Sequence, residues 1–396
     1  MTTSSAAPDG APRIRLSSPA DLIAATPYLL GFHPDDSMVT IALRGRAVVF
    51  AARADLPDPA GPVAGGAEAM ASALVDAARR QRPTALAIIG YGPDRRAGPA
   101  VDAVRSAARR RGLPVREALR VHEGRWWSYL CQEPRCCPAG GTPFDPLASA
   151  VAAQFTVAGS PVLPDRRALA RQVAPLEGSA RAAMAHATDR AWRELHDRLG
   201  GLTDARAAEV VIAEGREAVT HAIDTYGSGR RLADDGVARL TVLLHALPVR
   251  DTAWSAITSD QPHLRLWADI TRRAEARFVP APASLLAFAA WRAGNGALAS
   301  VALERALAAD PSYSMARLLR HGLQHGLPPS ALEGWGAPAG EARGQRQHRA
   351  GRAAGRPRRP GAPPAASGRR PGRGEGGRPP PQAAGGGDSA SRCSPA

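Results

Sequence analysis

The apolar run TALAIIGYG, residues 84–92, constrains the fold of this chain more than any other stretch. It is short, it begins after Pro83, a glycine at position 90 interrupts it near its end, and its apolar residues follow one another directly. This pattern is typical of a strand that is buried on both faces. Such a strand needs covering layers on both sides of its sheet, so the run predicts an α/β architecture.

The segments around this strand carry signals for helices and turns. In SSPADLIAATPYLLGFHP, residues 17–34, Ser18 can cap a helix that stops at Gly31, and Pro27 either kinks this helix or ends it early. The same reasoning predicts a hairpin turning at Arg44 and Gly45, helices over 67–81 and 99–111, and a second hairpin formed by 113–121 and 125–130. We therefore expect residues 13–145 to form an α/β domain, a mixed sheet with flanking helices.

Strand signals fade after residue 145, and Ala-, Leu- and Arg-rich stretches with helical spacing replace them. We expect an all-α domain over 146–335. Its predicted helices lie near 146–157, 165–173, 177–199, 203–226, 232–246, 262–276, 282–293, 296–309 and 312–324.

One stretch of this second part resembles a tetratricopeptide unit. This stretch is residues 291–313. Gly294 stands where such a unit has its turn glycine, and Pro311 where it has its terminating proline. The positions of close helix contact are occupied by Ala299, Leu303 and Ala306. The sequence contains one clear copy, whereas a solenoid needs about three. Two interpretations stay open: an ordinary helical hairpin, or a short repeat-like platform for a protein partner.

The C-terminal segment 336–396 cannot build a core. After Trp335 there is no Val, Ile, Leu, Met, Phe, Trp or Tyr. Burial of apolar side chains therefore cannot offset the backbone entropy lost on folding, roughly 1–2 kcal/mol per residue, and we predict that this segment is disordered. We predict disorder for residues 1–12 as well. Residues 341–396 carry 12 Arg and 3 acidic residues, which account for +9 of the formal net charge of +15. Nucleic acid is a disfavoured partner, because this tract lacks aromatic residues for stacking. GC-rich codon usage, or a shifted reading frame after residue 336, also explains its composition.

Neither secretion nor membrane insertion is expected. The N-terminal residues contain no apolar signal region, and no run of 18 apolar residues occurs. We therefore expect a cytoplasmic protein, in which thiols stay reduced.

Three of the four cysteines lie within WSYLCQEPRCCP, residues 127–138. Cys131, Cys136 and Cys137 have a C-x4-C-C spacing, and His122 lies on the facing strand of the predicted hairpin. Three thiolates and one imidazole would satisfy a tetrahedral zinc ion, although adjacent cysteines do not easily face one ion. The alternatives are a redox pair formed by Cys131 and Cys136, and three small buried residues without chemistry.

Two further stretches could bind ligands. GYGPDRRAG follows the central strand and precedes a helix, where open α/β sheets bind anions and nucleotides, but the full glycine fingerprint and the Walker lysine are absent. The stretch GFHPDDS has two interpretations: a site for a divalent cation or for acid/base chemistry, or a turn formed by its glycine, proline and aspartates. If the strands run parallel, we expect this stretch at the sheet edge opposite to GYGPDRRAG. The candidate residues are Gly90, Gly92, Asp94, Arg95 and Arg96 in the first stretch, and His33, Asp35 and Asp36 in the second.

Three segments together resemble a known family. They are LSSPADLIAATPYLLGFHPDDSMVTIALRG, WWSYLCQEPRCCPAGGTPFDP and PASLLAFAAWRAGNGALASVALERALAADPSYSMARLL. In this order they are similar to the domain of unknown function 4192 family of high-GC Gram-positive bacteria, over roughly residues 14–330. The resemblance implies a cytoplasmic bacterial protein with an α/β part followed by a helical part, and it assigns no activity to any residue.

Three functional hypotheses follow. The first is a ligand-binding or regulatory protein that holds a small anion or nucleotide near Gly90–Arg96 and meets a protein partner through its helices. The second is a zinc-dependent hydrolase or transferase built on the cysteine cluster, with His33 or Asp35 as acid/base. The third is an interaction module that needs neither site.

Overall fold

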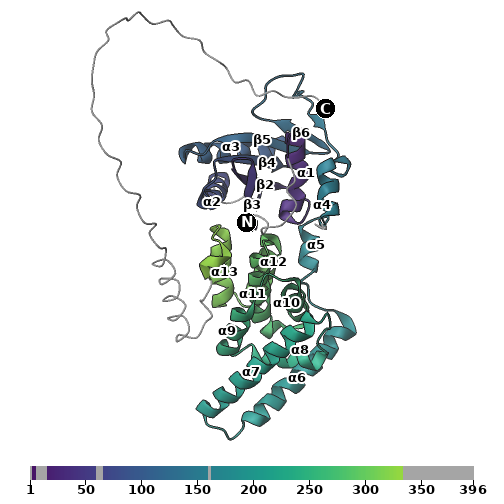
Figure 1. The fold of residues 1–396 in the computed structure, drawn as a ribbon, viewed down its shortest axis with the longest axis vertical. Coiled ribbons are helices and arrows are strands. Elements are labelled where there is room, and N and C mark those ends of the chain that lie inside the picture. The colour runs from purple at the N-terminus through teal and green to yellow at the C-terminus, as the bar shows by residue number, and fades with distance from the viewer. Residues whose placement is uncertain (1, 6–15, 59–65, 159–161, 333–396) are drawn as a thin grey trace, which may run out of the picture. The chain divides into compact units, whose positions relative to one another are not determined.

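The computed structural model of the chain describes residues 2–5, 16–58, 66–158 and 162–332 (Figure 1). All of the described residues belong to one unit, Met1–Ala337. Most of the two segments predicted to be disordered, 1–12 and 336–396, lies outside the described residues. The domain boundary expected between residues 145 and 146 stays a prediction.

The strands form one mixed sheet in the order β1-β3-β2-β4-β5-β6-β7. Within it, β4 and β5 are parallel, and the other neighbouring strands are antiparallel. The strands are β1 (Thr2–Ser5), β2 (Ser37–Arg44), β3 (Ala47–Asp55), β4 (Ala85–Tyr91), β5 (Val115–His122), β6 (Arg125–Ser128) and β7 (Thr142–Pro143).

Both predicted hairpins are present. β2 and β3 turn at Gly45, and β5 and β6 turn at Glu123 and Gly124, whose φ angles are 46° and 67°. Two successive positive φ angles are typical of the tight turn that matches the twist of antiparallel strands.

The central strand β4 is buried along its whole length, as its sequence predicted. Leu86 and Ile88 belong to a core shared with α2 (Gly66–Arg80) and α3 (Asp94–Arg110). Ile89 and Tyr91 point to the opposite face, into a core shared with α1 (Pro19–Leu30). Because side chains alternate along a strand, a continuous apolar run serves two cores at once.

The first helix, α1, follows its local signals closely. The Ser18 hydroxyl accepts the Asp21 backbone N–H at 3.1 Å, and the Asp21 carboxylate accepts the Ser18 N–H at 3.1 Å, which is a capping box. Gly31 ends the helix with a φ of 82°, and Pro27 lies inside it without ending it.

Helix α3 begins five residues before the predicted start at residue 99. The Pro93 carbonyl accepts the Ala97 N–H at 2.9 Å, and Asp94 places a negative charge in the first turn, which the helix dipole favours. Pro99 therefore lies inside the helix and does not open it.

The second half of the described chain is helical, as predicted. One helix was missed: α9 contains Pro248 near its start, where a proline opens a helix and does not break one. The elements are α4 (Ala150–Val157), α5 (Arg166–Arg171), α6 (Gly178–Leu199), α7 (Asp204–Gly227), α8 (Asp234–Leu243), α9 (Leu247–Ala256), α10 (Gln261–Arg273), α11 (Pro280–Arg292), α12 (Gly296–Ala309) and α13 (Ser314–Gln324), with short 3₁₀ turns η1 (Pro146–Ala148), η2 (Ala276–Phe278) and η3 (Pro329–Leu332).

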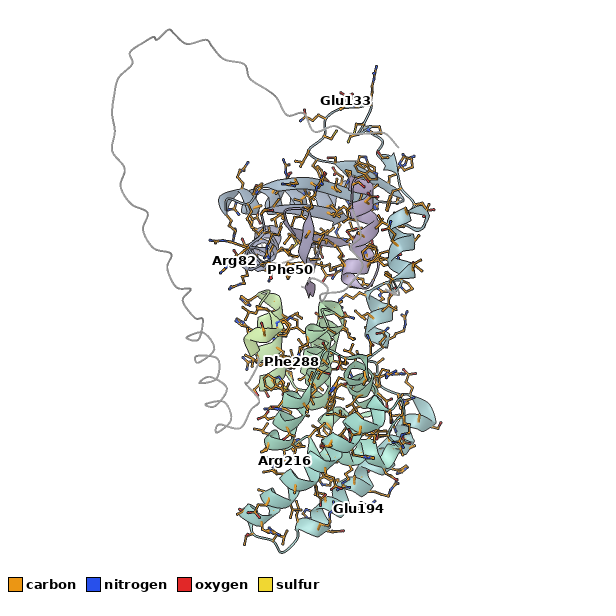
Figure 2. The ribbon with its side chains drawn as sticks, in the orientation of Figure 1. Phe50, Arg82, Glu133, Glu194, Arg216 and Phe288 are labelled. Carbon is orange, nitrogen blue, oxygen red and sulfur yellow. The ribbon has the colours of Figure 1, made fainter. Side chains whose placement is uncertain are left out.

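Helices α11 and α12 form the hairpin at the centre of this part. Its turn passes through Gly294, with a φ of 76°, and Asn295 caps α12 by accepting the Leu298 N–H at 2.9 Å. Every residue of α11 before Arg292 is buried, and Phe288 lies among the helices whereas Phe50 belongs to the sheet core (Figure 2). None of the described helices has the length and apolar character that crossing a membrane requires.

Candidate functional site

The three cysteines after β6 form the tightest chemical cluster in the described part of the chain. The sulfur atoms of Cys131, Cys136 and Cys137 all lie within 4.8 Å of one another, and the Cys136 and Cys137 sulfurs are 3.9 Å apart. No disulfide joins them, and each residue is partly exposed. The sulfurs of Cys136 and Cys137 thus lie close together although the two residues are adjacent.

A single backbone turn brings the adjacent cysteines together. The Glu133 carbonyl accepts the N–H groups of Cys136 and Cys137, at 3.0 and 2.7 Å. At the other end of the loop, the Ser128 hydroxyl accepts the Cys131 N–H at 3.1 Å. Both anchors are local, so contacts within the chain hold the loop that carries Glu133, labelled in Figure 2.

The returning limb of the loop is fixed against Trp127. The indole N–H donates to the Ala139 carbonyl at 3.1 Å, and the Arg120 guanidinium lies 3.6 Å from the ring centroid. Gly141 has a φ of 77°, and a Cβ there would lie 2.4 Å from Trp127 Cε2, so only glycine fits. Trp127, which precedes the cysteines, thus shapes the loop.

The thiols differ in acidity. A hydrogen bond with the Cys137 side chain holds the pKa of Cys131 below its ordinary value. Burial, together with hydrogen bonds to its two neighbours, raises the pKa of Cys137. Of these two thiols, Cys131 is therefore the one that ionises first, and thiolates are the form of cysteine that binds metals and attacks disulfides.

The spacing of the sulfurs suits a tetrahedral metal ion. Zinc–sulfur bonds of about 2.3 Å at tetrahedral angles place two thiolates about 3.8 Å apart, which agrees with the 3.9 Å between Cys136 and Cys137. The structure does not bring the predicted fourth ligand into this cluster. His122 instead has its Nε2 atom 3.7 Å from the Glu123 carboxylate.

The two other predicted stretches meet at one sheet edge. β2 runs antiparallel to β4, so Ser37 at the start of β2 pairs with Tyr91 at the end of β4. The expectation that GFHPDDS lies at the opposite edge, which assumed parallel strands, was wrong. Asp36 now forms an ion pair with Arg96, with 2.7 Å between Oδ1 and Nη1, and a Cβ at Gly92 would lie 3.3 Å from the same carboxylate.

The charges at this edge largely neutralise one another. Asp94 accepts a hydrogen bond from the Tyr129 hydroxyl at 2.7 Å and lies 3.3 Å from the Arg120 guanidinium. Burial and the bond to this carboxylate raise the pKa of Tyr129. Arg95 is exposed and forms no ion pair with any residue that the structure describes. Of the predicted anion ligands, Arg95 is therefore the one cation still available.

A buried arginine at this edge was missed in the sequence. Arg53 donates from Nε to the Ser37 hydroxyl at 2.8 Å and pairs with Asp55 at 2.7 Å, and burial lowers its pKa. The sequence marks Arg53 only as a single charged residue at an inward-facing position of a predicted strand. Nearby, burial lowers the pKa of His33, and Asp35 accepts the Asp36 N–H at 2.9 Å in a plain turn contact.

A comparison with protein-family models matches residues 19–330 to the family described as Domain of unknown function (DUF4192). The chain belongs to the DUF4192 family. The match begins at the first residue of α1 and ends within η3, so the DUF4192 region contains the thiol cluster, the sheet edge and the helices up to α13. No curated protein and no solved structure matches the chain.

Proposed function

We propose that this DUF4192 protein binds a thiophilic divalent cation, zinc before others, through the thiolates of Cys131, Cys136 and Cys137. The mutual approach of the three sulfurs to within 4.8 Å is the observation that supports the proposal. Zinc accepts thiolates at this spacing, and the backbone turn at Glu133 brings the two adjacent cysteines together.

Three protein ligands leave one coordination position open. The three cysteines are partly exposed, so solvent or a ligand atom can reach that position. Three ligands with an open site are typical of catalytic zinc, which lowers the pKa of a bound water and polarises carbonyl or phosphoryl oxygens. The zinc-dependent hydrolase or transferase expected from the sequence therefore has its best support at this loop.

Metal analysis of the full chain, purified with a reductant, tests the proposal. We expect one zinc per chain, and we expect Cys136→Ser to lose it because two thiolates and a hydroxyl bind zinc much less tightly. Cys393→Ser is the matched control, since it removes the one cysteine outside the cluster. Wild-type protein that contains no metal and takes up no added zinc would contradict the proposal.

Thiol redox chemistry is the second candidate, favoured by the lowered pKa of Cys131. Oxidation would join the Cys131 and Cys136 sulfurs, and the two protons and two electrons released would reduce a low-molecular-weight disulfide to two thiols. Metal-free protein incubated with oxidised glutathione should then lose two hydrogen atoms by mass spectrometry, and Cys131→Ser should not. If both proteins keep all their thiols, this candidate fails.

Three expectations from the sequence remain predictions. They are an anion or nucleotide at Gly90–Arg96, a protein partner on the helices, and a cytoplasmic location. Exposed Arg95 supports the first, and the three thiols without disulfides are consistent with the last, because reduced cysteines persist in the cytoplasm.

A further inference from the structure

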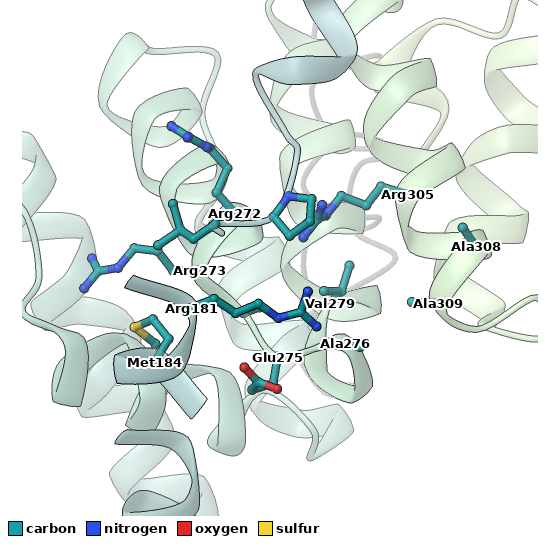
Figure 3. A pocket seen from close by; sticks show the side chains of 13 residues that line it. Arg181, Met184, Arg272, Arg273, Glu275, Ala276, Val279, Arg305, Ala308 and Ala309 are labelled. Atoms are coloured by element: carbon teal, nitrogen blue, oxygen red, sulfur yellow. The ribbon is translucent and has the colours of Figure 1, made fainter. Parts of the chain in front are cut away.

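The helical part contains a pocket that neither the thiol cluster nor the sheet edge uses. It has a volume of about 240 Å³ and lies where the segment before α6 meets α6, α10 and α12 (Figure 3). Leu176, Met184, Val279 and Ala308 supply apolar wall. Four of its 13 lining residues are arginines, which is unusual for a space between packed helices.

Three arginines from three helices line this pocket: Arg181 on α6, Arg272 on α10 and Arg305 on α12. Figure 3 shows the guanidinium groups of Arg181 and Arg305 reaching toward the same space from opposite sides. Arg273 also lines the pocket, but its guanidinium turns away to pair with Asp269, at 3.0 Å between Nη1 and Oδ2. Arg273 is therefore already neutralised.

The other arginines lack partners that would neutralise them. Arg305 donates from Nη2 to the Thr271 carbonyl at 3.0 Å, but its buried Nε has no hydrogen-bond partner. Burial and the charges of Arg181 and Arg272 lower the pKa of Arg305, and no carboxylate acts on it in the opposite direction. Within the described residues, neither Arg181 nor Arg272 forms an ion pair.

One carboxylate, Glu275, lines the described pocket, and it pairs with none of these arginines. The pocket therefore holds more positive than negative charge beside an unsatisfied buried donor. Arg305 is partly buried, whereas Arg181 and Arg272 are exposed, so the cost of burying a charge without a counter-charge falls on Arg305, and an anion beside it would offset that cost. Guanidinium forks match phosphate and carboxylate oxygens, and they bind such groups through paired hydrogen bonds.

We propose that this pocket binds a small phosphomonoester, with its phosphoryl group between Arg181 and Arg305. The volume corresponds to about eight water molecules, at about 30 Å³ each, so a phosphoryl group leaves room for a few carbon atoms. The apolar wall of Leu176, Met184 and Val279 suits those carbons. This site is separate from the thiol cluster, and it makes the helical part a ligand-binding part of the protein.

The test compares glycerol 3-phosphate, inorganic phosphate and succinate as ligands of the full chain, by calorimetric titration at constant ionic strength. Arg181→Gln removes one guanidinium from an exposed position, so it should fold normally. Arg216→Gln is the matched control, because Arg216 is an exposed arginine of α7 without an ion pair among the described residues.

We expect saturable binding of glycerol 3-phosphate that is about tenfold weaker in Arg181→Gln and unchanged in Arg216→Gln, since a charged hydrogen bond is lost only in the first. Tighter binding of the ester than of inorganic phosphate supports the assignment. Equal affinity for both would assign the pocket to free phosphate and overturn the ester. Preference for succinate, no saturable binding, or an unaffected Arg181→Gln would overturn the phosphoryl site.

Discussion

Asp269 anchors the most buried ion network of the described helices, and replacing it with asparagine should be costly. Its carboxylate accepts hydrogen bonds from Tyr226, Arg231 and Arg273, and the side chains of Asp269 and Arg273 are 10% and 8% exposed. Removing one partner of a buried ion pair costs about 3–5 kcal/mol, because the other charge stays buried. Arg273 keeps its ion pair with Asp234, so we expect the lower end, about 3 kcal/mol.

Urea unfolding of Asp269→Asn and the wild type measures this difference, and Asp235→Asn is the matched control. Asp235 pairs with Arg190 at the surface, where both side chains are at least half exposed, so its loss should cost less than about 1 kcal/mol. Similar losses of unfolding free energy in Asp269→Asn and Asp235→Asn would refute the claim that burial makes the Asp269 network costly to break.

The same network predicts a dependence on pH. Burial alone would raise the pKa of Asp269, but the hydrogen bonds from the tyrosine and the two arginines outweigh it and hold the pKa below 3.8. The folded state thus releases this proton more readily than the unfolded chain, so its stabilisation is complete above about pH 4 and is lost as the pH falls through the folded-state pKa. The difference between wild type and Asp269→Asn should shrink in acid. A difference that grows as the pH falls would contradict the assigned charge state.

Three further outcomes are expected. In urea titrations, Gly215→Ala should lower the free energy of unfolding by about 1–3 kcal/mol, because the new Cβ would lie 2.2 Å from Val249 Cγ2. The control is Gly236→Ala, whose Cβ would meet no atom closer than 3.5 Å. This control should leave the free energy of unfolding equal or up to about 1 kcal/mol higher. Ser18→Ala removes the capping box of α1 and should cost about 1 kcal/mol by the same assay. Burial lowers the pKa of His263, so the melting temperature should fall as the pH drops below 6.5, and His263→Gln should lose that part of the slope.

Local signals were sufficient where one segment decides its own structure. Ser18 and Gly31 bound α1, Gly45 turns the first hairpin, and the apolar succession in β4 predicted burial on both faces. These features depend on neighbours a few residues away, which the sequence shows directly. The turn and anchors of the Cys131 loop also lie within a dozen residues, but the sequence did not predict that its three sulfurs converge.

Non-local arrangements could not be predicted in this way. The direction of β2 relative to β4 decides whether Asp36 meets Arg96, and the sequence contains no signal for that pairing. The phosphoryl pocket draws Arg181 and Arg305 from helices more than a hundred residues apart. In a chain whose 51 basic residues are all arginine, no single arginine stands out.

X-ray absorption at the zinc edge of the full chain, loaded with one equivalent of zinc under reducing conditions, tests the central claim most directly. The account predicts three sulfur scatterers at about 2.3 Å, with one lighter atom at the open position. Cys136→Ser should bind zinc much less tightly, and any zinc that it still holds should have at most two sulfur scatterers. A first shell of nitrogen and oxygen alone, in a wild type whose three thiols react freely, would contradict the account.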